Sequence, residues 1–228
     1  MTEPATSQGR LPGRRQQAAR NDAVILQAAR EVFIADPAAP IAAVAQRAGV
    51  GISALYRRYP SKEDLLRQLC HDGLRQFIAI AEQAGTEPDS WQAFTAFLAG
   101  VVAADVHSLT VHLAGTFTPT PEMEQDAVTA TRLADGLLHR ASASGQLRPG
   151  VVAGDITLVL EGCAAIRLPD RERSGQLRLR YLTLLLDGLR DDRGPLPGPA
   201  PGQQELNWRW RQDPAAARGR PLARQAAA

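Results

Sequence analysis

Residues 41–59 read Ile-Ala-Ala-Val-Ala-Gln-Arg-Ala-Gly-Val-Gly-Ile-Ser-Ala-Leu-Tyr-Arg-Arg-Tyr, and their spacing suits two short helices joined by a tight turn. The point where two such helices cross needs a small side chain, which Ala45 supplies. The turn needs a residue that tolerates positive φ, which Gly49 supplies. Leu55 gives the second helix an apolar anchor against the first. The spacing predicts a helix-turn-helix, although an ordinary helical hairpin with a glycine turn would share it.

The second helix of this motif leaves small and basic residues on its outer side. They are Gly51, Ser53, Ala54, Arg57 and Arg58. Small side chains let a helix approach DNA closely, and arginine side chains reach guanine edges or phosphates. We expect this side of the helix to be the one that contacts DNA.

The charge of the chain is concentrated around this motif. Residues 10–62 contain nine Arg and Lys side chains against three Asp and Glu, whereas the whole chain has a net charge of only +2. A basic segment on a nearly neutral chain indicates a polyanionic partner at that segment. A solvated surface face would give the same charge count, so charge alone leaves both readings open.

Outside the motif, apolar periodicity and capping signals predict an all-α protein. The expected helices cover about 20–35, 41–48, 51–58, 62–84, 90–106, 107–115, 121–145, 153–167 and 172–190. Residues 1–19 are polar and predict a disordered basic arm. A three-helix DNA-binding domain is expected over 20–66 and a helical domain over 67–190. A Pro/Gly-rich linker and tail follow over 191–228.

The two cysteines and the hydropathy pattern favour a cytoplasmic protein. Cys70 and Cys163 lie far apart in apolar surroundings and form neither a disulfide framework nor a zinc pattern, which favours a reducing compartment. We expect no signal peptide, no membrane span, no cofactor and no metal. His107 and His112 are five residues apart, so a helix would splay them and a shared metal is not expected.

Residues 24–66 resemble the DNA-binding domain of the TetR family of bacterial regulators. The resemblance rests on the apolar helix that ends at Phe33, on residues 41–50, and on Leu55-Tyr-Arg-Arg-Tyr-Pro-Ser-Lys-Glu-Asp-Leu-Leu66. A weaker likeness extends to about residue 190. Residues 34–40 depart from the family pattern, and residues 191–228 extend beyond the usual end of the family.

This resemblance implies roles for individual residues and an assembly. Tyr56 and Lys62 would bind DNA phosphates, and Gly51, Ser53, Ala54 and Arg57 would read bases. The family is homodimeric through its last two core helices, which agrees with apolar stripes over 156–163 and 177–189. A two-fold dimer would place two recognition helices ~34–36 Å apart on a palindromic operator.

The resemblance also implies a cavity for an unidentified small-molecule effector in the helical domain. Candidate lining residues by position are Trp91, Phe94, Phe97, His107, Thr110, His112, Phe117 and Arg167. The aromatic candidates would equally suit a plain hydrophobic core. Arg167 would either pair with an acidic ligand or lie on the surface.

The expected function is therefore a sequence-specific repressor that a small-molecule effector releases from its operator. A DNA-binding activator or a constitutive binder fits the same sequence, because the sign of regulation depends on where the operator lies. A helical enzyme or binding protein without DNA function is the third alternative. We expect no enzyme, since the sequence has no di-iron Glu-x-x-His pair, no Gly-rich phosphate loop and no nucleophile with its base.

Overall fold

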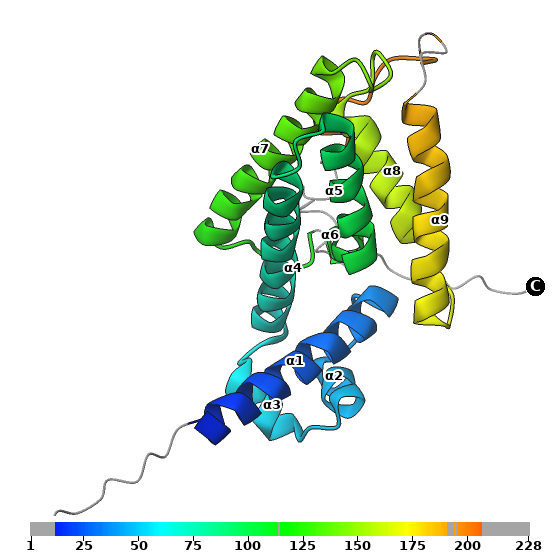
Figure 1. The fold of residues 1–228 in the computed structure, drawn as a ribbon. Helices are drawn as coiled ribbons and strands as arrows, with labels where there is room; N and C mark the ends of the chain where they lie inside the picture. The colour runs from blue at the N-terminus through cyan, green and yellow to red at the C-terminus, as the bar shows by residue number, and fades with distance from the viewer. Residues whose placement is uncertain (1–11, 114, 191–193, 195, 207–228) are drawn as a thin grey trace, which may run out of the picture. The chain divides into compact units, whose positions relative to one another are not determined.

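The computed structural model describes residues 12–113, 115–190, 194 and 196–206, and within these residues it contains helices and loops but no strand. The chain divides into two compact units, residues 1–69 and 70–228. The predicted all-α architecture is confirmed, and α2 to α9 lie within about two residues of the expected ranges (Figure 1).

The first unit contains the predicted helix-turn-helix. Its elements are α1 (Pro12–Ala35), α2 (Ile41–Ala48), α3 (Ile52–Arg58) and the first two turns of α4 (Lys62–Gly85). Each helix contributes to one small core, in which Phe33, Val44, Leu55 and Leu65 are fully buried. Because α3 has seven residues and only Leu55 among them is buried, most of its surface is left to solvent.

Gly49 closes α2 as the sequence predicts. It has a φ of +66°, and its N–H donates to the carbonyls of Ala45 and Gln46. The next N–H, that of Val50, also donates to the Ala45 carbonyl at 3.0 Å. These bonds satisfy carbonyls that a helix end leaves open, and the left-handed residue redirects the chain into α3.

Helix α1 begins earlier than the sequence indicated. We expected its start near residue 20 and a disordered arm before it, but the helix begins at Pro12. Proline suits a first helical position because its missing N–H would have no intrahelical acceptor there. Residues 12–19 therefore belong to α1, and the rest of the expected arm, 1–11, lies outside the described residues.

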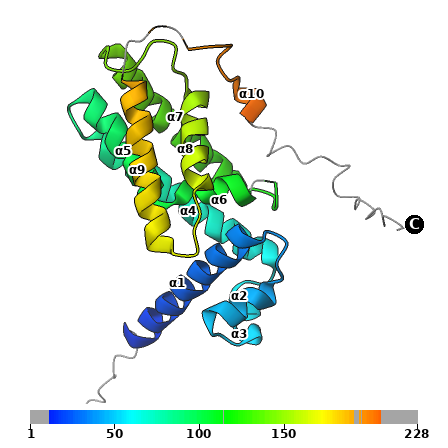
Figure 2. The same ribbon diagram turned by 90° about the vertical axis from the view of Figure 1, so that its right-hand side faces the viewer.

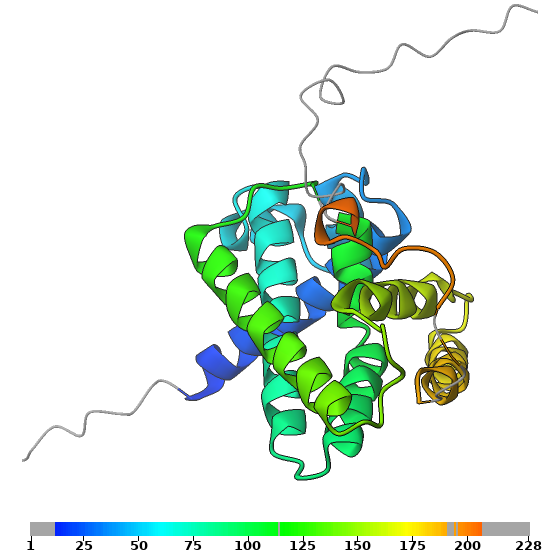
Figure 3. The same cartoon turned by 90° about the horizontal axis from the view of Figure 1, so that it is seen from above.

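The second unit is built around α5. It contains the rest of α4 with α5 (Ser90–Ala104), α6 (Val106–Leu113), α7 (Pro121–Ala143), α8 (Ala153–Ala165) and α9 (Arg171–Leu189). Helix α5 packs against α6, α7, α8 and α9, and it buries Phe94, Phe97 and Leu98. Helices α8 and α9 lie side by side at the edge of this unit (Figures 2 and 3).

Side-chain caps explain where several of these helices begin. Asp89 accepts from the N–H of Gln92 at 2.7 Å, and Thr120 accepts from that of Met123 at 3.3 Å. Asp170 caps α9 in the same way. Each carboxylate or hydroxyl satisfies an N–H that the first turn leaves without an acceptor.

The segment after α9 folds back onto the second unit over its described part. The guanidinium of Arg148 donates to the carbonyl of Gly194 at 2.9 and 3.1 Å. Pro201 lies so close to Gly154 of α8 that a Cβ there would come within 2.8 Å of it. A short helix, α10 (Gln203–Leu206), follows, which the Pro/Gly-rich composition did not predict. Trp208 and Trp210 lie outside the described residues.

In the part of the chain that the structure describes, no helix has both the length and the apolarity that crossing a membrane requires. The same residues contain no group of three or more His, Cys, Asp or Glu side chains placed to hold a metal ion.

Candidate DNA-binding surface and ligand cavity

The solvent side of α3 carries the residues expected to contact DNA. Gly51, Ser53, Tyr56 and Arg57 are exposed, and Ala54 is half-buried. Tyr56 has 47% of its surface exposed. Sequence reasoning did not single out Ile52, which is 40% exposed on this short helix. A branched apolar side chain at such a place suits the methyl group of thymine.

The two adjacent arginines of α3 have different surroundings. Arg57 has no ion-pair partner among the described residues. Arg58 makes a two-pronged ion pair with Asp22 of α1, with both nitrogen–oxygen distances 2.8 Å. The hydrogen bond to Asp22 raises the pKa of Arg58. Arg58 therefore ties α3 to α1, while Arg57 is available to an external anion.

Lys62 holds the loop between α1 and α2. Its Nζ donates to the carbonyls of Pro37 and Ala39 at 2.7 and 2.8 Å, and it lies 5.0 Å from the centre of the Phe33 ring. Burial lowers the pKa of this ammonium. An ammonium has three donors, and two of them point to this loop, which leaves one for a phosphate. The loop is part of residues 34–40, where the sequence departs from the family pattern.

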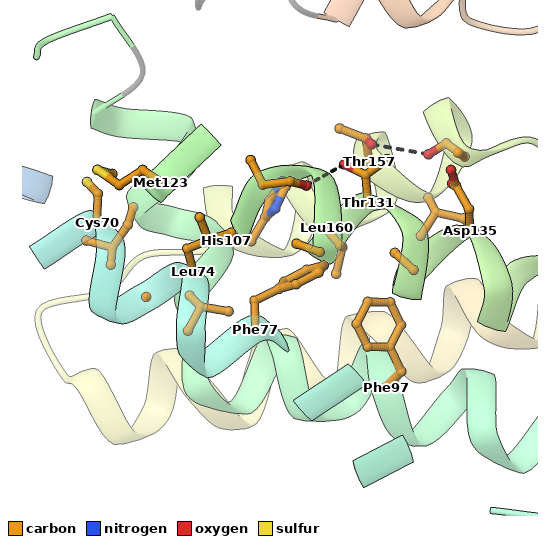
Figure 4. Close-up of a pocket in the computed structure, with 18 of the residues that line it drawn as sticks. Cys70, Leu74, Phe77, Phe97, His107, Met123, Thr131, Asp135, Thr157 and Leu160 are labelled. Atoms are coloured by element: carbon orange, nitrogen blue, oxygen red, sulfur yellow. Dashed lines mark hydrogen bonds between the residues drawn. The ribbon is translucent and has the colours of Figure 1, made fainter. Parts of the chain in front are cut away.

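The second unit contains a cavity of about 750 Å³. Its walls come from α4, α5, α6, α7, α8 and the loop before α7. Figure 4 shows Phe77 and Phe97 on one side of it, and their rings meet edge to face with centroids 5.2 Å apart. Cavities of this size, mainly apolar with a few polar groups, are typical of sites for drug-sized ligands.

The structure brings together only part of the predicted ligand set. Phe97, His107 and Phe117 line the cavity. Trp91 and Phe94 lie instead in the hydrophobic core, with ring centroids 5.9 Å apart. The side chain of Thr110 lies outside those that the structure describes.

His112 and Arg167 contact each other outside the cavity wall. Arg167 Nη1 lies 3.0 Å from His112 Nε2, and His112 Nδ1 lies 2.8 Å from the carbonyl of Ser108. Because a guanidinium only donates, Nε2 accepts and the ring hydrogen is on Nδ1. Arg167 is therefore bonded to the His112 ring, and neither side chain lines the cavity.

Sequence reasoning missed the whole of the cavity wall that α7 contributes. Glu124, Ala127, Thr131 and Asp135 are exposed residues three or four positions apart, so they form one stripe along α7, and all four line the cavity. This spacing was visible in the sequence. A mixed polar stripe is, however, also typical of a solvated helix face.

A buried ion pair joins α9 to the junction of α5 and α6. Arg178 of α9 is 7% exposed, and its Nη1 lies 2.5 Å from a carboxylate oxygen of Asp105. Its Nε donates to the carbonyl of Ile166 at 2.9 Å. Asp105 has a φ of +55°, and its carboxylate also accepts from the hydroxyl of Ser108. This network fixes α9 against the segment that leads directly to His107 of the cavity wall.

The two cysteines have different environments. Cys163 of α8 is buried, and desolvation raises the pKa of its thiol to about 11. It is therefore an unreactive core side chain at neutral pH. Cys70 is half-buried and lines the cavity near Met123 (Figure 4).

Both units match known families. Residues 25–69 match the model for bacterial regulatory proteins of the tetR family, and residues 89–191 match the model for the C-terminal domain of SbtR-like transcriptional regulators. No curated protein matches the chain in sequence. The fold and these matches define a helix-turn-helix transcriptional regulator. The chain belongs to the TetR family of bacterial regulatory proteins.

Solved structures share the fold. The regulator PfmR from Thermus thermophilus is 20% identical, with a TM-score of 0.54, and the match covers 73% of this chain and 99% of that one. LfrR from Mycobacterium smegmatis, solved in complex with proflavine, is 24% identical, with a TM-score of 0.52. The match covers 72% of this chain and 95% of LfrR. A tetR-family protein from Rhodococcus is 19% identical, with a TM-score of 0.56. The match covers 75% of this chain and 97% of the Rhodococcus protein.

Proposed function

We propose that this regulator is a repressor that binds a palindromic operator as a homodimer and is released by a small molecule held in the cavity. The observation that carries the proposal is the outer side of α3, where Arg57, without an ion-pair partner among the described residues, lies next to exposed Tyr56 on a helix anchored by Leu55. We assign DNA binding to residues 20–66, and ligand binding and dimerisation to 67–190. Such a protein would work in the cytoplasm, where the DNA is.

The contacts of the residues in and beside α3 suggest a separate role in DNA binding for each of them. Arg57 would read a base edge, with Gly51, Ser53 and Ala54 allowing close approach. Tyr56 and the third donor of Lys62 would bind phosphates. Arg58 would act as a positioning residue, because its guanidinium is bonded to Asp22. This role differs from the direct DNA contact expected from the sequence.

Exposed apolar side chains on α8 and α9 support the homodimer. Leu158 of α8 is 46% exposed and Leu184 of α9 is 63% exposed, and the ring of Tyr181 of α9 lies against Gly162 of α8. Water-exposed apolar side chains of this size on two adjacent helices are typical of a surface that another chain covers. A second copy of the chain would pair these faces about a two-fold axis.

The cavity supports the effector part of the proposal. It lies wholly within the second unit, and its volume of about 750 Å³ suits a drug-sized molecule. The similar protein LfrR was solved with the small molecule proflavine. The proposal gives this cavity a binding role and no catalytic one.

Selection of DNA sites from a random duplex pool tests the proposal. The purified protein should enrich one palindrome whose half-sites are ~10 base pairs apart or a multiple of that. Enrichment of an unrelated set of sequences, or none above a bead control, would contradict sequence-specific binding. The reciprocal effect of DNA and ligand on each other's affinity then tests release.

A further inference from the structure

We propose that the cavity selects a lipophilic organic cation, with Glu124 and Asp135 neutralising its charge. The proposal rests on the proposed function, because it names the chemical class of the effector for the cavity described above. The cavity itself defines the site, and the charge and hydrogen-bonding character of its wall decide the class of ligand.

The charged groups of the wall have one sign. Glu124 and Asp135 line the cavity, and no Lys or Arg is among the described residues that do so. His107 is the one potentially basic side chain in that set. An anionic ligand would therefore meet two carboxylates and no fixed positive charge, whereas a cation would meet favourable charge at both.

The other two acids of α7, Glu122 and Asp126, have partners on α4, and in this they differ from Glu124 and Asp135. Glu122 pairs with Arg75 at 2.7 Å, and Asp126 pairs with His71 at 2.8 Å, so α4 supplies partners for that side of α7. Glu124 and Asp135 have no ion-pair partner among the described residues. The two carboxylates that line the cavity are thus the acids of α7 that have no basic partner on α4.

The hydroxyl groups of the wall add acceptors. Thr131 donates its hydroxyl hydrogen to the carbonyl of Ala127 at 2.9 Å, and Thr157 donates to that of Ala153 at 3.1 Å (Figure 4). A hydroxyl whose single hydrogen is used in this way can only accept from a ligand. Both threonines therefore favour a ligand that donates hydrogen bonds, as an ammonium or an aromatic amine does.

The apolar part of the wall suits the body of such a ligand. Phe77 and Phe97 present aromatic rings, and aromatic faces attract cations in addition to excluding water. Glu124 and Asp135 are eleven residues apart on α7, which places them about 16 Å apart along the helix. The two carboxylates therefore lie toward opposite ends of the α7 side of the cavity, and a cation several rings long would fit between them.

Two probe ions of equal shape and opposite charge test this proposal. Tetraphenylphosphonium and tetraphenylborate would be titrated into the full chain by calorimetry at low salt. We expect the phosphonium to bind at least about tenfold more tightly. The preference should shrink in 1 M salt, because both carboxylates are partly exposed to solvent.

Substitutions test whether Glu124 and Asp135 cause the preference for the phosphonium over the borate. The double variant Glu124→Gln and Asp135→Asn should weaken phosphonium binding about tenfold and leave borate binding unchanged or tighter. Glu82→Gln is the matched control, because Glu82 is an exposed carboxylate of α4 that does not line the cavity. It should change neither affinity, and thermal melts of all variants would show that they fold.

Three results would overturn the proposal: equal or tighter binding of the borate, a charge preference that survives in the double variant, or no binding of either ion. The proposed repressor function has a separate readout in the anisotropy of labelled operator DNA. Phosphonium binding that leaves DNA affinity unchanged would contradict release but keep the ligand class. Release from DNA by uncharged or anionic compounds alone would support ligand-induced release but contradict the proposed ligand class.

Discussion

Arg57 and Arg58 are neighbours in the chain, but their contacts give them different roles. Arg57 has no ion-pair partner among the described residues, whereas Arg58 is bonded to Asp22 of α1. A sequence motif cannot distinguish them, because both are basic and both lie on the outer side of α3. The distinction depends on Asp22, which is 36 residues away in the chain.

Alanine substitutions separate these two roles. Arg57→Ala should cost about 1–3 kcal/mol on the operator and relax the preference at one base position, because a guanidinium reads guanine edges. Arg58→Ala should weaken operator and random DNA alike, and Asp22→Ala should reproduce its effect. Anisotropy titrations on the operator and on single-base variants measure this, and equal loss of base preference in both arginine variants would contradict the assignment.

Lys62 combines a structural and a DNA-binding role in one ammonium. Lys62→Gln keeps an amide donor for the loop carbonyls of Pro37 and Ala39 but removes the charge. We expect binding to all DNA sequences to weaken and the slope of log affinity against log salt to flatten by about one. An unchanged salt slope, with the loop intact by hydrogen exchange, would show that Lys62 serves the loop alone.

At the scale of elements, the turn between α2 and α3 depends on Gly49. A Cβ at this position would meet nothing within 4 Å, so only the φ of +66° opposes a side chain. Gly49→Ala should destabilise the protein by about 1–2 kcal/mol, and Gly49→Asn by less, since asparagine tolerates this conformation. Thermal or urea unfolding measures the difference.

Gly85→Ala is the control for this prediction, because Gly85 also has open space around its Cβ but no positive φ. It should be neutral or slightly stabilising. A similar destabilisation at both glycines would mean that backbone conformation is not what Gly49 provides.

The proposed dimer interface on α8 and α9 can be tested by placing a charge in it. Leu184→Glu should shift the protein from dimer to monomer, because it places a charge in the centre of the proposed apolar interface. Thr183→Glu adds the same charge at an exposed position that lies about 100° around α9 from Leu184, and it should leave the dimer intact. Light scattering after size exclusion measures the mass, and a monomeric wild type or an unaffected Leu184→Glu variant would contradict this interface.

Apart from the start of α1 and the short α10, the helices were predictable from the sequence, whereas the residues that line the cavity were predictable only in part. Gly49 ends α2 as expected, and Ser61, Asp89 and Thr120 are equally local signals, since each accepts a hydrogen bond from an N–H in the first turn of the helix that follows it. A cavity arises where neighbouring helices fail to fill the space between them, which depends on packing across the whole unit. Phe94 and Phe97 illustrate this, since they lie on the same helix and only Phe97 reaches the cavity.

In the whole molecule, release by an effector requires that the cavity and the DNA-binding surface influence each other. Within the second unit, Arg178 links α9 to Asp105, and α6 leads from there to His107 of the cavity wall. A ligand that moves α6 would thereby act on one of the two helices of the proposed dimer interface. Because coupling is reciprocal, the factor by which ligand weakens DNA binding should equal the factor by which DNA weakens ligand binding.

Fluorescence anisotropy measures sequence-specific DNA binding by this protein without a further step. The purified protein would be titrated against DNA that flanks its own gene and against a scrambled duplex, over a salt series. We predict saturable binding to one palindromic fragment that exceeds binding to the scrambled duplex by ~10³-fold or more at physiological salt. Weak and equal binding to both duplexes, lost as salt rises, would contradict sequence-specific DNA binding if DNA selected from a random pool behaved in the same way.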